Sequence, residues 1–281
     1  MKKLNLLVIF SLLLSLFIYV SPSSAASNVK VHVIDVGQGD SILIQTGNEN
    51  VLIDGGNKGK GDEVVAYLKK QKVKTLNAVV STHPDADHVG GLAEVINSLN
   101  VKSVYAPKVT HTTQAYKNFL TAVKKEGLKI KVAKKGVEIP TKAKNITLKF
   151  LAPVKEYTKS DLNDWSGVLQ LTHSKKKFLF TGDAETQAEN DMLKAGVLSK
   201  VDVLKVSHHG AKEATGTSFL NKVKPTYAVI SVSKTNGYGH PTAETLNRLK
   251  KAKTKVYRTD KNGNVIFTST GSKISVKVDK N

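Results

Sequence analysis

The 281-residue sequence contains no cysteine. This absence excludes disulfide bonds, thiolate metal ligands, a cysteine nucleophile and a lipid-modified cysteine after a signal segment. Any bound metal ion would therefore be held by histidine and carboxylate side chains.

Acidic residues are scarce relative to basic ones, with 23 Asp and Glu against 43 Lys and Arg and a formal net charge of +20. This balance favours a polyanionic partner such as DNA, RNA or an anionic cell-wall polymer. The lysines are nevertheless spread along the whole chain, and aromatic residues, which provide base-stacking surfaces, make up only 6%. Charge alone leaves nucleic-acid binding and simple solubility equally open.

Long apolar runs are confined to residues 4–20, which follow Lys2 and Lys3 and precede small residues up to Ala26. This order is typical of a secretory signal peptide. We predict that residues 1–26 are a signal peptide and that residues 27–281 form a single domain. The mature protein would be secreted, with association to the cell wall left open, and would not span a membrane. An uncleaved N-terminal anchor is the alternative.

The remaining chain alternates short β-type runs with amphipathic segments. Apolar and alternating patterns predict strands at residues 29–36, 41–46, 51–54, 77–82, 101–106, 146–152, 167–173, 176–181, 201–206, 227–232, 255–258, 265–268 and 273–278, with a turn at 262–263. Helical spacing predicts helices at 62–71, 89–99, 113–126, 185–195 and 242–251. Two β-rich halves with accompanying helices predict an α+β fold of two face-to-face sheets with helices outside.

Residues 79–91, Val-Val-Ser-Thr-His-Pro-Asp-Ala-Asp-His-Val-Gly-Gly, form the most informative segment. A buried strand ends just before four side chains that can bind metal, His83, Asp85, Asp87 and His88. Imidazole together with carboxylate suits zinc, manganese or iron.

This segment resembles the His-x-His-x-Asp-His motif of the metallo-β-lactamase superfamily, with Asp85 in place of the second histidine. The His-x-Asp-x-Asp-His variant is similar to the hydrolase domain of ComEC, the DNA-uptake channel of competent bacteria. Residues 33–41, 52–56, 180–183 and 204–210 match further family motifs in the same order. The resemblance covers nearly all of residues 27–281 and implies an αββα four-layer sandwich built on two mixed sheets.

The resemblance also implies a centre of two divalent ions, Zn²⁺ or Mn²⁺. His83 and Asp85 would bind one ion, Asp87, His88 and His208 the other, and Asp183 would bridge them. We prefer His208 to His209 as the ligand, although the motif leaves the choice open. A capping aspartate at the start of a helix is the alternative role for Asp183.

One departure from the superfamily pattern concerns the first ion. Many members supply a third histidine before a central strand, whereas residues 161–167 contain none. Asn163 or Asp164 could replace it or hold a water molecule, which would favour manganese. His173 is predicted to be a surface residue, and Trp165 to serve in packing.

Other polar residues have predicted roles around the ions. Asp87 could orient a metal-bound hydroxide or accept its proton, and His240 could contact a phosphate, protonate a leaving group or merely cap a helix. Lys205 could steady a phosphate or face solvent. Asp40 and Asp54 are predicted to order the surrounding loops.

The leading functional hypothesis is a secreted phosphodiesterase, a nuclease acting on DNA, with no stable protein partner implied. Hydrolysis of a small ester or lactone on the same centre is the alternative. An envelope-binding protein with a structural metal site is a third class, which the number of metal-capable residues disfavours.

Overall fold

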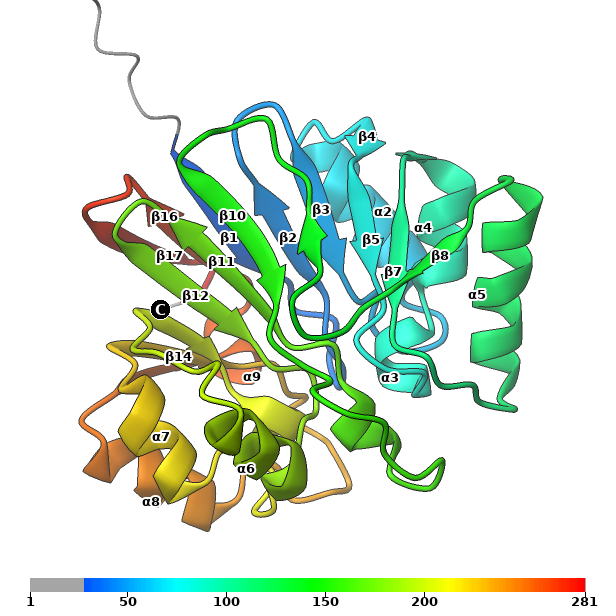
Figure 1. Cartoon of the computed structure of the whole chain (residues 1–281). Coiled ribbons are helices and arrows are strands. Elements are labelled where there is room, and N and C mark those ends of the chain that lie inside the picture. Colours follow the sequence, from blue (N-terminus) through cyan, green and yellow to red (C-terminus); the bar gives the residue numbers. More distant parts are fainter. Residues whose placement is uncertain (1–27, 281) are drawn as a thin grey trace, which may run out of the picture.

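The computed structural model describes residues 28–280, so the predicted signal peptide lies outside the described residues. Within this range, no helix combines the length and the apolar character needed to cross a bilayer. Figure 1 shows two β-sheets stacked face to face, with one group of helices on the outer side of each.

The first sheet has the strand order β17-β16-β1-β2-β3-β5-β7-β8. Its strands are β1 (Val29–Val33), β2 (Ile42–Gln45), β3 (Asn50–Ile53), β5 (Ala78–Val80), β7 (Val104–Ala106), β8 (Ile130–Val132), β16 (Val265–Ser269) and β17 (Ile274–Val278). Strands β3, β5, β7 and β8 are mutually parallel, whereas the others pair antiparallel. The loops that follow β3 and β5 therefore leave the sheet side by side at one edge.

The second sheet has the strand order β15-β14-β13-β12-β11-β10-β9. Its strands are β9 (Glu138–Ile139), β10 (Ile146–Phe150), β11 (Leu169–His173), β12 (Lys176–Phe180), β13 (Val203–Lys205), β14 (Tyr227–Ile230) and β15 (Lys255–Arg258). Strands β12 to β15 are parallel. The carboxyl ends of parallel strands are the usual place for a functional site, because the loops that follow them converge there.

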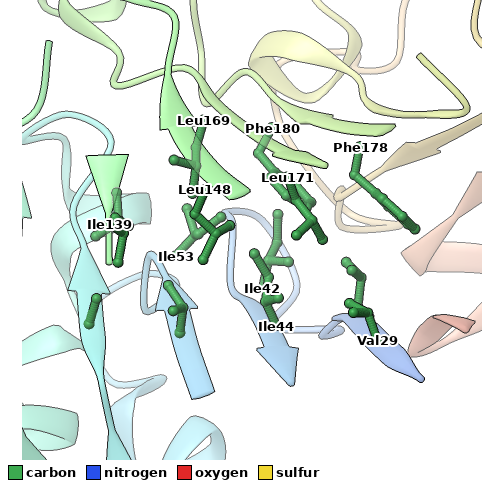
Figure 2. Packing of buried hydrophobic residues seen from close by; sticks show 14 of the residues in the cluster. Val29, Ile42, Ile44, Ile53, Ile139, Leu148, Leu169, Leu171, Phe178 and Phe180 are labelled. Atoms are coloured by element: carbon green, nitrogen blue, oxygen red, sulfur yellow. The ribbon is translucent and has the colours of Figure 1, made fainter. Parts of the chain in front are cut away.

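Strand periodicity explains how both faces of the first sheet are covered. Along β2, Ile42 and Ile44 belong to the core between the sheets, whereas Leu43 packs in the core beneath the helices. In Figure 2, Ile42, Ile44 and other side chains of the first sheet point toward Leu148, Leu171 and Phe180 of the second. Each fully buried side chain of this kind contributes about 1.5–3 kcal/mol.

Helices complete the outer layers. The first sheet is covered by α2 (Gly61–Lys70), α4 (Leu92–Ser98) and α5 (Gln114–Lys125), whose apolar faces share one core with it. The second is covered by α6 (Thr186–Lys194), α7 (Thr217–Val223) and α8 (Ala243–Lys251). The structure also contains the short helices α3 (Ala86–Val89) and α9 (Thr259–Asn262), the 3-10 turns η1 (Leu162–Trp165) and η2 (Ser207–Gly210), and a pairing of β4 (Thr75–Leu76) with β6 (Asn100–Val101). The predicted α+β four-layer sandwich is confirmed.

The C-terminal region differs from the prediction. A turn was expected at 262–263 within a closing set of strands, but β15 lies in the second sheet and β16 in the first. The short helix α9 makes the crossing, because Thr259 is anchored by hydrogen bonds between its side chain and Val232. Strands β8 and β9 and helix α7 were not predicted, since each is short.

Candidate metal centre

The loop after β5 carries the predicted cluster to the edge of the first sheet. His83 lies three residues after the end of β5, and the single turn of α3 places Asp87 and His88. Glycine makes this placement possible, because a Cβ at Gly39 would lie 2.2 Å from the carbonyl oxygen of Asp87. A Cβ at Gly90 would lie 2.3 Å from the amide nitrogen of Lys58. The absence of a side chain at Gly90 and Gly91 therefore permits the close packing of this helix against the preceding loop.

Four side chains converge at the junction of the two sheets: Asp87, His88, Asp183 and His209 each offer one atom, all within 4.8 Å of one another. Asp183 follows β12, and His209 lies in η2 after β13. Asp183 Oδ2 is 3.1 Å from His88 Nε2 and 3.4 Å from His209 Nε2, and His209 Nε2 is 3.2 Å from Asp87 Oδ2. We call these four residues the central group.

His83 and Asp85 lie beside the central group. The Nε2 atom of His83 is 3.5 Å from Asp85 Oδ2, and the imidazole ring centroid of His83 is 4.1 Å from that of His88. His83 is fully buried, whereas the side chain of Asp85 is 34% exposed. Of the six predicted metal ligands, the structure thus brings four together, His83, Asp87, His88 and Asp183, and it places Asp85 on the solvent side.

Contacts to the Nδ1 atoms orient the imidazole rings of His83, His88 and His209. Asp54 Oδ2 contacts His88 Nδ1 at 2.9 Å and also accepts a hydrogen bond from the Thr82 hydroxyl. That hydroxyl is 3.1 Å from His83 Nδ1, and the carbonyl of Ser231 accepts a hydrogen bond from His209 Nδ1 at 2.9 Å. All three rings therefore direct Nε2 into the cluster, an arrangement typical of metal-binding histidines.

The atoms that face one another inside the cluster have unfilled bonding capacity. Within residues 28–280, the buried atoms without a hydrogen-bond partner include Nε2 of His83, His88 and His209 and Oδ1 of Asp183. A buried polar group without a partner costs about 1–3 kcal/mol, so several together are not expected in a purely structural site. Nitrogen and carboxylate donors in this arrangement fit divalent cations such as zinc or manganese.

The pKa values of the buried side chains also indicate a site for cations. Burial by itself would raise the pKa of Asp183, but His88 and His209 hold that pKa well below its ordinary value. Burial would lower the pKa of His209, yet Asp183 and Asp87 raise it to about 10. The buried carboxylates thus require positive charge beside them, and that charge can come from protons or from metal cations.

The geometry favours His209 over His208 in the central group. His208 Nε2 is 3.8 Å from Asp183 Oδ2, and its Nδ1 is hydrogen-bonded to Glu185 at 2.9 Å. Both histidines have left-handed backbone angles, φ 45° for His208 and φ 50° for His209. Because this turn breaks the strand alternation, the preference for His208 had no reliable basis in the sequence.

His240 lies at the rim, with its ring centroid 5.4 Å from that of His208. Burial, His208 and His209 lower its pKa, which favours the neutral imidazole. His240 does not cap the following helix, because the Thr242 hydroxyl accepts the hydrogen bond from the Thr245 amide.

Both residues considered as replacements for the third histidine are hydrogen-bonded near the start of α6. Asp164 Oδ1 accepts hydrogen bonds from the backbone amides of Glu185 and Ala188 at the start of α6. Asn163 donates to the carboxylate of Glu185 at 2.9 Å. These hydrogen bonds hold Asn163 and Asp164 beside Glu185, next to the cluster.

Two further predictions are corrected. Lys205 does not face solvent and cannot reach a phosphate there, because it is fully buried with Nζ 2.8 Å from Asp40 Oδ2. His173 is not a surface residue: it is fully buried, and its Nδ1 is 3.0 Å from the Ser269 hydroxyl of the facing sheet. Asp40 does order the site, since its backbone amide donates to the carbonyl of Asp87.

Two open pockets adjoin the cluster and share Asp85. The acidic pocket, of about 530 Å³, is lined by Asp85, Ser160, Asp161, Leu162, Asn163, Asp164, Glu185, Thr186, Gln187 and Glu213. The neutral pocket, of about 440 Å³, is lined by Gln38, Asn57, Asp85, Ala86, Asp87, Ser233, Thr235, Asn236, Gly237 and Tyr238. The cluster can therefore be approached from solvent.

Two stacked sheets with a histidine and aspartate cluster at their common edge define a metallo-β-lactamase fold. Residues 34–234 match the family described as the Metallo-beta-lactamase superfamily, and the chain belongs to this superfamily. The membership predicted from the motifs is confirmed.

Among individual proteins, the chain is similar to ComE operon protein 3 of Bacillus subtilis (strain 168), with 32% identity over 90% of this chain and 34% of that protein. It is 30% identical to Recombination protein 2 of Haemophilus influenzae over 84% of this chain and 28% of that protein. The chain thus spans about a third of the length of these relatives. The crystal structure of the metallo-beta-lactamase fold protein YhfI from Bacillus subtilis aligns with 86% of this chain and all of that one, at a TM-score of 0.57 and 14% identity. This last likeness concerns the fold alone.

Proposed function

We propose that the protein is a metal-dependent phosphodiesterase that cleaves DNA outside the cell. The observation that carries the proposal is the convergence of buried side-chain atoms that have no hydrogen-bond partner within the described residues, from His83, His88, Asp183 and His209. His83, Asp85 and Asp183 would hold one divalent ion. Asp87, His88 and His209 would hold a second, with Asp183 shared between the two.

Such ions, Zn²⁺ or Mn²⁺, would lower the pKa of a bound water and polarise the phosphodiester. The protein's own residues supply orientation and proton transfer. The side chain of Asp87 is 26% exposed and lines the neutral pocket, so it can orient an attacking water and accept its proton. His240 is half-buried at the rim of the cluster, with its ring centroid 5.4 Å from that of His208, and its imidazole would interact with the leaving oxygen from that position.

Three observations support DNA as the substrate. The motif variant is similar to that of a DNA-uptake hydrolase, one relative is a recombination protein, and the chain has a formal net charge of +20. Secretion is part of the proposal and rests on the signal-like pattern of residues 1–26.

Hydrolysis of a small ester or lactone is the second candidate. The acidic pocket favours it, because Asp85, Asp161, Asp164, Glu185 and Glu213 in its lining would repel a polyanion. The two candidates therefore predict different substrates for the same metal centre.

The decisive experiment measures turnover of bis-p-nitrophenyl phosphate, plasmid DNA, single-stranded DNA, RNA and a small lactone with added Mn²⁺ or Zn²⁺. We expect phosphodiester cleavage that stops when the metal is chelated. Asp183→Asn should lower the rate by at least about 100-fold, since even residues that only support metal ligands cost 10- to 100-fold when lost. Asp62→Asn, the same change at an exposed position of α2, should retain the wild-type rate. Lactone turnover without phosphodiester cleavage would remove the proposal in favour of the second candidate.

A further inference from the structure

The two pockets beside the metal cluster differ in charge. Five of the ten residues that line the acidic pocket carry carboxylates, and its lining includes no lysine or arginine. The lining of the neutral pocket has only two carboxylates, Asp85 and Asp87, and both belong to the proposed metal site. Its other polar residues are uncharged amides and hydroxyls.

This contrast selects the route for a nucleic-acid strand. Every nucleotide carries a phosphate charge, so the acidic pocket opposes its entry. In the neutral pocket, bound cations would compensate Asp85 and Asp87. Exposed lysines flank lining residues of both pockets in the sequence, Lys58 and Lys234 for the neutral pocket and Lys159 and Lys212 for the acidic one, so the contrast lies in the lining residues themselves.

An exposed aromatic residue stands in the lining of the neutral pocket. Tyr238 is 73% exposed, more than any other large hydrophobic side chain of residues 28–280. Its ring is stacked on that of His240, with centroids 5.7 Å apart and planes inclined by 25°. His240 in turn meets His208 edge to face at 5.4 Å and 77°. A continuous row of rings therefore runs from the rim of the metal cluster to Tyr238.

The loop that carries Tyr238 is internally braced. Asn236 Oδ1 accepts hydrogen bonds from the backbone amides of Tyr238 and His240, at 3.2 and 3.0 Å. Asn236 Nδ2 donates to the carbonyls of Ser233 and His240, each at 2.8 Å. The backbone that carries Tyr238 is thus held in a defined place and its ring is stacked on His240, and a prearranged aromatic face is suited to binding a flat ligand.

We propose that Tyr238 is a base-stacking platform that holds an unpaired nucleobase next to the phosphodiester at the metal cluster. The inference rests on the proposed phosphodiesterase function and specifies its substrate as single-stranded DNA lying in the neutral pocket. Stacking on an aromatic side chain requires a base freed from the duplex, and it tolerates any sequence because every base has a π face.

The test compares two substrates that share one chemistry, thymidine 5′-(p-nitrophenyl phosphate) and methyl p-nitrophenyl phosphate, on the Mn²⁺-loaded protein. The wild type should prefer the nucleoside ester by about tenfold or more in kcat/KM, from the stacking contribution of one base. In Tyr238→Ala this preference should fall close to one, mainly through KM. Tyr238→Phe, which keeps the ring, should retain the preference, as should Leu120→Ala, which removes another exposed apolar side chain.

A binding measurement tests base stacking on Tyr238 independently of the kinetics. Fluorescence anisotropy of labelled oligothymidylate dT8 and of an abasic octamer with the same charge separates stacking from electrostatic attraction. Tyr238→Ala should weaken dT8 binding by about tenfold and bring it close to that of the abasic strand.

The possible failures are distinguishable. Turnover of both esters without a nucleoside preference would overturn the platform and leave the phosphodiesterase standing. Absence of turnover for both would overturn the phosphodiesterase. Equal binding of dT8 and the abasic strand by the wild type would overturn the platform whatever the kinetics show.

Discussion

The buried ion pair between Lys205 and Asp40 offers a quantitative test of how the site is supported. Lys205 Nζ lies 2.8 Å from Asp40 Oδ2 and also donates to the carbonyl of Val206 at 2.8 Å. Both charged side chains are almost completely buried. Lys205→Met keeps a similar length and volume but leaves the carboxylate of Asp40 in the interior without its cation.

Breaking a buried pair in this way costs about 3–5 kcal/mol, because the remaining charge has lost its solvation and its partner. For a domain of this size each kcal/mol corresponds to 2–4 °C, so the midpoint of thermal unfolding should fall by roughly 6–20 °C. Activity should also fall, since the backbone amide of Asp40 holds the carbonyl of Asp87.

Urea unfolding followed by circular dichroism measures this free energy. Lys108→Met provides the control, because Lys108 and Glu156 form a pair 3.3 Å apart in which both side chains are 74% exposed. Such a surface pair contributes at most about 1 kcal/mol. The double variant Lys205→Met with Asp40→Asn should recover part of the loss, because a neutral amide needs no cation. A loss for Lys205→Met within about 1 kcal/mol of the Lys108→Met control would refute the reasoning.

Three further predictions concern pH, backbone space and core packing. Burial raises the pKa of Glu189 from 4.5 to about 7. Ionisation of Glu189 therefore opposes folding. The free energy of unfolding, which has its full value below pH 4.5, should decline by roughly 3 kcal/mol as the pH rises past 7. Glu189→Gln mimics the neutral acid, so its unfolding free energy, measured from pH 4 to 8, should lack this decline, and parallel curves for the two proteins would disprove the assignment. Gly39→Ala should lower turnover by about 100-fold by displacing Asp87, whereas Gly37→Ala, also at positive φ but with open space around it, should leave turnover within a few-fold of wild type; equal rates for the two variants would contradict this. Leu171→Ala should cost about 2–5 kcal/mol in urea unfolding and Leu120→Ala, at an exposed position, far less.

Much of the fold follows from local pattern. Strands such as β2 and β12 could be predicted because their alternating side chains divide between two cores, and α5 because its apolar residues recur at helical spacing. The short edge strand β8 could not, since only Ile130 of its three residues is even half-buried. The partner of a strand cannot be read from a single sequence, so the turn predicted at 262–263 did not reveal that β15 and β16 belong to different sheets.

Some residues of the candidate site were likewise predictable from local pattern, and others were not. The loop at residues 83–88 was predictable because a buried strand ends just before it, and Asp183 because it follows β12. The position of His209 depends on two successive left-handed residues, which no alternation rule describes. His173 could have been placed correctly, since it shares strand parity with the core residues Leu169 and Leu171. Lys205 is buried only because Asp40, distant in the sequence, supplies a partner.

The most direct test of the central claim is the metal content of the purified protein after dialysis, measured by plasma mass spectrometry for the wild type, Asp183→Asn and Asp62→Asn. If the buried cluster binds two divalent cations, the wild type and Asp62→Asn should each retain close to two Zn²⁺ or Mn²⁺ ions per chain, and Asp183→Asn should lose most of both while remaining folded by circular dichroism. A wild type that retains no metal, or an Asp183→Asn variant that retains as much as the wild type, would contradict the account.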